Sequence, residues 1–321
     1  MPALATRLTR TLGLAAPIVL APMAFAAGGA LAAAVTRAGG LGLIGGGYGD
    51  ADWLEQQFAL AAGEAVGVGF ITWSLARNPS LLAGVLKHGP AAVMLSFGDP
   101  RPFAPEIRAA GARLICQCQE IAHVAQAIEA GADVVVAQGS EAGGHGAARG
   151  TLAFVPEVAD HLARHAPDTL LLAAGGIADG RGLAPALLLG ADGVLMGTRF
   201  WATNEALVKE GHHRALLQTA GDGTLRTCVP DVIRQLPWPK PFTARIRRNA
   251  FTERWHGREE DLARVAADEA LPYRAAADAG DGENTAVWFG EAAGLIHEIV
   301  PAAQVVRAPV DGALAALRRP L

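Results

Sequence analysis

Cysteine, lysine and tyrosine are scarce in this sequence: its 321 residues include 3 Cys, 3 Lys and 2 Tyr. The cysteines, Cys116, Cys118 and Cys228, are too few for a disulfide framework and lack the spacing of a zinc site, so we expect no metal. A low cysteine content also favours a reducing compartment, and we expect a cytoplasmic protein. Because Tyr48 and Tyr273 are the only tyrosines, a tyrosine-lined substrate site is not expected.

Long apolar segments are also absent. The Ala-rich stretch at 21–35 is interrupted by Pro22, Gly28 and Gly29, which is typical of a strand, a loop and a helix rather than a membrane span. Residues 1–17 lack the uninterrupted apolar core of a signal peptide. The net charge is −4 and the basic residues are scattered, which argues against nucleic acid as a partner. We therefore expect a monomer or homodimer that acts on a small molecule, with no membrane or nucleic-acid partner.

Glycine, in contrast, is abundant, and four glycines mark a repeated junction between a helix and a strand. Gly39, Gly111, Gly131 and Gly190 each precede a short apolar run. Such a glycine can end a helix in the left-handed conformation, and a near-continuous apolar run is typical of a buried parallel strand. The strands expected on this basis are 17–21, 42–45, 66–71, 92–96, 113–117, 134–137, 170–174 and 193–196.

Eight strand–helix units in about 200 residues predict an α/β fold of the (β/α)8 TIM barrel type. An open, doubly wound sheet is the alternative, but no G-x-G-x-x-G turn follows the first strand. After residue 199 the composition changes, with three tryptophans and the Pro237-Trp238-Pro239 segment. We expect 1–199 to form the barrel core, 200–275 a helical lid over its carboxyl-terminal mouth, and 276–321 a helix that returns to the barrel.

One loop stands out at the carboxyl end of an expected strand. Residues 138–146 contain four glycines and His145, and they follow the apolar run at 134–137. Glycine lets the backbone approach a ligand closely, and active sites of TIM barrels lie at this end of the strands. We therefore expect His145 to face the substrate, where it could take a proton from carbon or hold an anion by hydrogen bonding. A solvent-exposed loop histidine is the alternative.

Two further glycine loops follow the seventh and eighth expected strands. They are Ala174-Gly175-Gly176 and Met196-Gly197-Thr198. TIM barrels often bind a phosphate group at this position through backbone N–H groups and a helix N-terminus, so we expect a phosphate site. Tight turns without a ligand are the alternative. Pro185 falls inside the helix expected after the first of these loops, which predicts that this helix kinks or begins late.

These motifs together resemble the nitronate monooxygenase family, formerly called 2-nitropropane dioxygenase. The resemblance rests on Ala21-Pro22-Met23, on Gln138 with Gly143-Gly144-His145, and on the two glycine loops above; it covers about 17–206 and resumes near 287. It implies a TIM barrel that holds FMN without a covalent bond, with His145 as the catalytic residue. It implies flavin contacts at Ala21, Pro22, Met23, Gly45, Gly46, Gln138, Gly143, Gly144, Ala174, Gly175, Gly176, Met196, Gly197 and Thr198.

One position departs from the family pattern. An Asn usually ends the third strand and contacts the flavin, but this sequence has Gly69 there. This departure puts one of the implied flavin contacts in question.

The resemblance implies the FMN-dependent oxidation of an alkyl nitronate by O2 to a carbonyl compound and nitrite. A related activity with the same fold and cofactor is the alternative: an NAD(P)H-dependent reductase of quinones or enoyl thioesters. A barrel that binds a phosphate-bearing ligand without catalysis is a third hypothesis. The absence of a dinucleotide-binding fingerprint favours the first hypothesis over the second.

Overall fold

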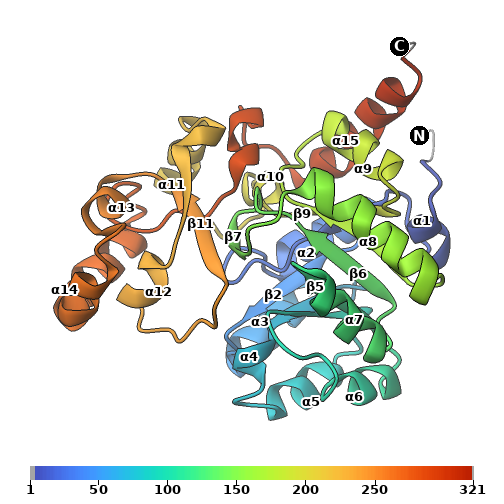
Figure 1. Ribbon diagram of the computed structural model, residues 1–321, viewed down its shortest axis with the longest axis horizontal. Coiled ribbons are helices and arrows are strands. Elements are labelled where there is room, and N and C mark those ends of the chain that lie inside the picture. Colours follow the sequence, from blue (N-terminus) through green and yellow to red (C-terminus); the bar gives the residue numbers. More distant parts are fainter. Residues whose placement is uncertain (1–3, 320–321) are drawn as a thin grey trace.

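The computed structural model describes residues 4–319, and its centre is a closed barrel of eight parallel strands (Figure 1). Around the barrel the strand order is β1-β9-β8-β6-β5-β4-β3-β2, and a bridge between Val19 and Leu41 closes the circle. The strands are β1 (Ile18–Leu20), β2 (Leu43–Gly47), β3 (Gly67–Ile71), β4 (Ala92–Ser96), β5 (Arg113–Cys118), β6 (Val134–Gln138), β8 (Leu170–Ala174) and β9 (Gly193–Met196). The predicted TIM barrel is confirmed.

Alternate side chains of each strand enter two different cores. One core fills the barrel itself and includes Val19, Met94 and Ile115, whereas neighbouring residues such as Ile18 and Val93 pack outward against helices. Sheet strands buried on both faces need apolar residues at every position, which is why these runs are so continuous. The surrounding helices are α1 (Arg7–Leu12), α2 (Gly29–Arg37), α3 (Ala51–Leu60), α4 (Thr72–Leu75), α5 (Ser80–Leu86), α6 (Ala104–Ala109), α7 (Ile121–Glu129), α8 (Thr151–His165), α9 (Gly180–Leu188) and α10 (Thr198–Trp201).

Helix α9 does not begin late. It starts at Gly180, where Asp179 caps it by accepting a hydrogen bond from the Arg181 N–H at 2.8 Å, and it continues through Pro185. The cap satisfies one of the free N–H groups of the first turn, so the helix forms at its expected start despite the proline.

The lid contains the expected helices and also two strands, which the prediction of a helical lid did not include. Its elements are α11 (Glu210–Leu217), η1 (Gly221–Gly223), β10 (Thr224–Thr227), α12 (Val229–Ile233), β11 (Thr243–Arg247), α13 (Ala250–Trp255) and α14 (Glu259–Ala279). Along β11 the buried Ala244 and Ile246 alternate with half-buried arginines, which is the period of a strand rather than a helix.

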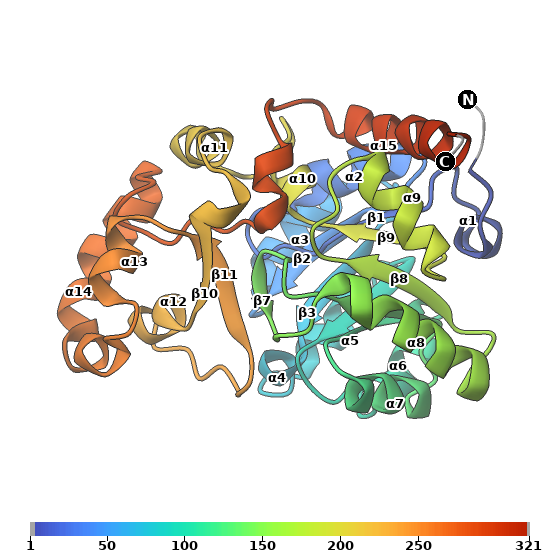
Figure 2. The same ribbon diagram turned by 45° about the horizontal axis from the view of Figure 1, so that its top comes forward.

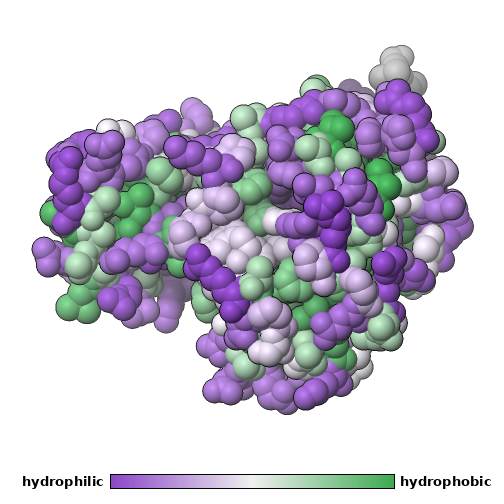
Figure 3. All heavy atoms as spheres, turned by 60° about the horizontal axis from the view of Figure 1, so that its bottom comes forward, coloured by the Kyte–Doolittle hydropathy of each residue, from purple (hydrophilic) through white to green (hydrophobic). Residues whose placement is uncertain are grey.

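A short segment of the barrel joins the lid sheet. Strand β7 (Gly144–Gly146) pairs with β11, which in turn pairs with β10, both antiparallel (Figure 2). The loop that carries His145 is therefore the third strand of the lid sheet. Barrel and lid form two lobes, and the surface is indented between them on the face shown in Figure 3.

The end of the chain returns to the barrel. Residues 286–301, expected to begin a helix, instead form an irregular segment with the 3-10 helix η2 (Glu291–Leu295). Helix α15 (Ala302–Leu317) follows and packs against α9 and α2. Within residues 4–319, no helix is both long and apolar enough to cross a membrane. The division of the chain at residues 199 and 275 stays a prediction, and the outermost parts of its ranges, residues 1–3 and 320–321, lie outside the described residues.

Candidate active site

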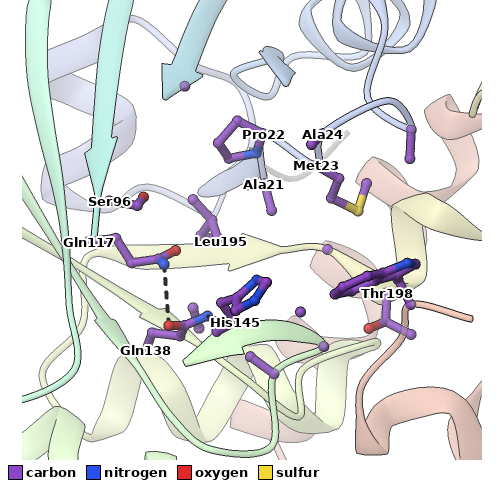
Figure 4. Close-up of a pocket in the computed structure, with 18 of the residues that line it drawn as sticks. Ala21, Pro22, Met23, Ala24, Ser96, Gln117, Gln138, His145, Leu195 and Thr198 are labelled. Atoms are coloured by element: carbon purple, nitrogen blue, oxygen red, sulfur yellow. Dashed lines mark hydrogen bonds between the residues drawn. The ribbon is translucent and has the colours of Figure 1, made fainter. Parts of the chain in front are cut away.

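A cavity of about 270 Å³ lies at the carboxyl ends of the barrel strands, under the lid. This is the place and the approximate size expected for a small-molecule site. Figure 4 shows Pro22 and Met23 on one side of it and Gln138 and His145 on the other. The predicted site residues that line the cavity are Ala21, Pro22, Met23, Gln138, Gly143, Gly144, His145, Ala174, Gly175, Gly176, Gly197 and Thr198.

Three predicted flavin-contacting residues lie behind the cavity wall instead. A Cβ atom on Gly45 would collide with the Met23 carbonyl oxygen, and one on Gly46 would lie 2.7 Å from the Gly69 carbonyl oxygen. Met196 is buried, with its side chain in the core between barrel and helices. Gly45 lets the loop after β1 pack closely onto β2, and Gly46 lets β3 do so.

Gly69 lines the cavity, and the reason for its departure from the family pattern is steric. A Cβ atom at this position would collide with the ring of Pro22. Gly69 is the middle residue of β3, and the proline ring fills the space in which a side chain at this position would begin. An asparagine could therefore enter here only if the loop after β1 moved.

One end of the cavity is formed by peptide groups. Gly175 and Gly176 have φ values of 108° and 73°, a region that favours glycine. Among residues 4–319, the N–H groups of Gly176 and Gly197 have no hydrogen-bond acceptor. Beside them the Thr198 hydroxyl accepts a hydrogen bond from the Gly290 N–H at 2.9 Å. Such N–H groups at the ends of two neighbouring parallel strands can bind an anion.

His145 is held at the wall of the cavity from several sides. Its backbone pairs with Ala244 in the lid sheet, and its carbonyl accepts a hydrogen bond from Gln138 Nε2 at 3.0 Å. Its ring is buried, and Nε2 lies 2.9 Å and 3.0 Å from the two carboxylate oxygens of Asp231. The imidazole is thus fixed in position and does not point into solvent.

Asp231 determines which imidazole nitrogen is basic. Burial lowers the pKa of His145 below its usual value, although the hydrogen bond and the charge of Asp231 oppose this effect. The imidazole is therefore neutral near pH 7, and Nε2–H donates to the carboxylate. That tautomer leaves Nδ1 as the lone-pair acceptor. Asp231 also accepts a hydrogen bond from Arg234 Nη2 at 3.1 Å, so its charge is paired with Arg234 while it accepts a hydrogen bond from His145.

Aromatic rings form the other end of the cavity. The indole of Trp238 stacks on the imidazole of His145, with 3.3 Å between the ring centroids. Its Nε1–H donates to the hydroxyl of Tyr48 at 3.0 Å, and Phe97 and Trp288 pack nearby. The expectation that no tyrosine lines the site is wrong, because Tyr48 directly follows β2 and enters the cavity wall.

Two lid arginines hold the loop that carries His145. Arg226 and Arg245 both donate from Nε to the carbonyl oxygen of Ser140, at 3.2 Å and 2.8 Å. Arg245 also forms an ion pair with Glu291 at 2.9 Å. Burial, followed by the charge of Arg245, lowers the pKa of Arg226 to about 10. These two arginines, one on β10 and one on β11, thus connect the lid to the loop.

The sequence that forms this site matches a known family. The family model described as nitronate monooxygenase matches residues 75–311, which contain five of the eight barrel strands, the whole lid and most of α15. The chain belongs to the nitronate monooxygenase family. The resemblance expected from its glycine loops is thereby confirmed.

Similar proteins span its whole length. A nitronate monooxygenase of Metarhizium robertsii is 37% identical over 94% of this chain and 91% of its own. The solved structure of FabK from Thermotoga maritima has a TM-score of 0.86 and 30% identity, covering 98% of both chains. A nitroalkane oxidase from Streptomyces ansochromogenes has a TM-score of 0.82 and 28% identity, covering 97% of this chain and 99% of its own.

Sequence reasoning missed four residues of the site: Tyr48, Asp231, Arg234 and Trp238. A proline near the start of a short apolar segment marks α12, and Asp231 and Arg234 lie three residues apart on it. That spacing is also typical of an ordinary surface ion pair, so it does not single out a site. Trp238 had a clearer signal, since a tryptophan between two prolines is a rigid aromatic group.

Proposed function

We propose that this member of the nitronate monooxygenase family oxidises alkyl nitronates with O2 to carbonyl compounds and nitrite, using FMN. The observation that carries the proposal is the neutral imidazole of His145, buried at the cavity wall with Nε2 engaged by Asp231. This arrangement suits a substrate that either carries an acidic C–H bond or has already lost that proton. The protein acts on a small molecule and O2 as a monomer or homodimer. Its free cysteines agree with a cytoplasmic location.

The cavity fits FMN on the chemistry of its lining. The unpaired N–H groups of Gly176 and Gly197, with the Thr198 hydroxyl, would hold the phosphate. Pro22 and Gln138 would contact the ring system from opposite sides of the cavity. When bound, FMN supplies the redox chemistry by accepting electrons from the substrate and passing them to O2.

The protein itself supplies a base and a rigid frame. Nδ1 of His145 takes a proton from the carbon beside the nitro group, and the electron pair of the broken C–H bond moves onto the nitro oxygens. Asp231 keeps the other nitrogen protonated, so the basic nitrogen is always the same one. With a nitronate as substrate, this proton transfer has already occurred, and His145 only holds the anion.

The decisive test compares electron donors under anaerobic conditions. The purified holoenzyme is mixed with propionate 3-nitronate or with NADH, and the bleaching of its flavin absorbance is followed. We expect bleaching by the nitronate and none by NADH. Rapid, stoichiometric bleaching by NADH or NADPH would overturn the proposal in favour of a quinone or enoyl-thioester reductase. A colourless protein that takes up no FMN would also contradict the proposal that FMN is the cofactor.

A further inference from the structure

Tyr48 is held at the cavity wall by its surroundings. It follows β2 directly, and its carbonyl oxygen accepts a hydrogen bond from the Ser74 hydroxyl at 3.0 Å. Its ring packs edge-on against Trp73 and Trp238, with 6.0 Å and 6.4 Å between ring centroids. These contacts fix the direction of the phenol and bring its oxygen to the lid side of the cavity.

The two lone pairs of this oxygen are both in use. Tyr48 Oη accepts one hydrogen bond from Trp238 Nε1 at 3.0 Å and another from Arg234 Nη2 at 3.3 Å. A phenol hydroxyl has one proton to donate and two acceptor sites. The remaining direction is therefore left to the O–H proton, which has no acceptor among residues 4–319. Burial raises the pKa of Tyr48, so this proton is retained through the neutral range.

Arg234 provides a second donor beside the first. Its Nε donates to the Pro230 carbonyl at 2.9 Å, and its Nη2 is shared between Asp231 and Tyr48. The guanidinium lies 4.9 Å from the ring centroid of Trp288, in cation–π contact. Within the described part of the chain, Nη1 donates no hydrogen bond, and the residue lines the same cavity as Tyr48.

We propose that the Tyr48 hydroxyl and Arg234 Nη1 together bind the two oxygens of the substrate's nitro or nitronate group. The inference rests on the proposed function and names the substrate class of its site: compact planar anions with two adjacent oxygens. When His145 Nδ1 takes the proton from carbon, the C–H electron pair becomes a C=N bond and the negative charge spreads over both oxygens. Two fixed donors stabilise that charge as it develops.

Trp238 contacts both His145 and one member of the donor pair, Tyr48. Its face covers the imidazole, while Nε1, at the edge of the same indole, donates to Tyr48. Asp231 provides a second connection, because it contacts both His145 and Arg234. The base and the two donors are therefore connected through one indole and one carboxylate, and all three residues line the same cavity.

The experiment compares Tyr48→Phe with a matched control. Tyr273→Phe removes the only other phenol hydroxyl of the chain, which is buried in the lid core and does not line the cavity. Two quantities are measured on the holoenzymes. The first is kcat/KM for nitroethane, in which the charge develops as the proton leaves carbon, and the second is the dissociation constant of nitrate, a planar oxyanion, from the perturbation of the oxidised flavin spectrum. We expect Tyr48→Phe to lower kcat/KM about 100-fold and to weaken nitrate binding about 10-fold, with FMN content unchanged. Tyr273→Phe should match wild type in both.

Arg234 is tested separately, by charge and by shape. Arg234→Lys keeps the charge but loses the planar guanidinium with its fixed N–H donors, and Arg234→Gln loses both. Nitrate binding should therefore weaken in that order. Nitrate binding by Tyr48→Phe and Arg234→Gln at the wild-type level would overturn the inference. If the wild-type flavin is not reduced by the nitronate, the proposed function fails instead, and the nitrate titration still tests the donor pair by itself.

Discussion

The indole of Trp238 lies parallel to the imidazole of His145, with 3.3 Å between ring centroids and 5° between the ring planes. Trp238 belongs to the lid segment between α12 and β11, whereas His145 comes from the loop after barrel strand β6. The base of the site is therefore completed by the lid, which supplies its orienting carboxylate as well. Neither lobe contains the arrangement by itself.

Replacing Trp238 with Ala should raise the pKa of His145. Desolvation is the largest influence on this pKa and lowers it, so admitting water to the exposed ring face returns the pKa toward about 6.5. The neutral imidazole is the proton acceptor, so the acid limb of kcat/KM for nitroethane should move to higher pH. Trp238→Phe keeps an aromatic cover and should leave the limb close to its wild-type position. An unchanged limb in the Ala variant would show that the stack does not control the pKa.

Replacing Asp231 with Asn should shift the same limb in the opposite direction. Asp231 raises the pKa of His145 by its hydrogen bond and its charge, so its removal lowers that pKa. The neutral tautomer is no longer fixed, and the plateau rate with nitroethane should fall about 100-fold or more. Turnover of a preformed nitronate should fall much less. Asp231→Glu should restore part of the loss, which a purely structural defect would not allow.

Replacing His145 with Asn separates its two roles. The variant should keep FMN, because the glycine loops that would hold the phosphate are untouched. It should lose most turnover with neutral nitroethane and less with ethylnitronate, since only the former requires removal of a proton from carbon. Steady-state rates with both substrates, under matched O2, give the comparison. Equal losses on the two substrates would argue against proton abstraction by this residue.

The barrel could be predicted from the sequence because its signal is local. The strands at Ala92–Ser96, Leu170–Ala174 and Gly193–Met196 begin and end where their apolar runs do. The lid strands were missed because arginines occupy alternate positions of β11, and their burial against Ser140 depends on a partner about 100 residues away in the chain. Local periodicity carries no information about such a partner.

The site could be predicted only in part, for the same reason. The glycine loops and His145 carry their own pattern, because a backbone that approaches a ligand needs glycine at fixed places. Tyr48 and Arg234 meet across a separation of 186 residues, and nothing near either of them in the sequence distinguishes it from a surface residue. The identity of the donors around the substrate therefore depends on how lid and barrel come together.

Gly69 offers a test of how closely the cavity wall is packed. A methyl group at this position would collide with the Pro22 ring, whose loop lines the cavity, so Gly69→Ala must displace that loop. Overpacking of this kind costs about 1–3 kcal/mol of folding free energy. We expect a lower Tm and a lower ratio of FMN to protein after gel filtration.

The matched control for this change is Gly84→Ala. Gly84 lies within helix α5, where a Cβ atom would meet nothing within 4 Å. Alanine is favoured over glycine inside a helix by about 0.5–1 kcal/mol, so this variant should be slightly more stable and should retain its flavin fully. If Gly69→Ala behaved in the same way, the loop after β1 would have room to move, and an asparagine at this position would be compatible with the cavity after all.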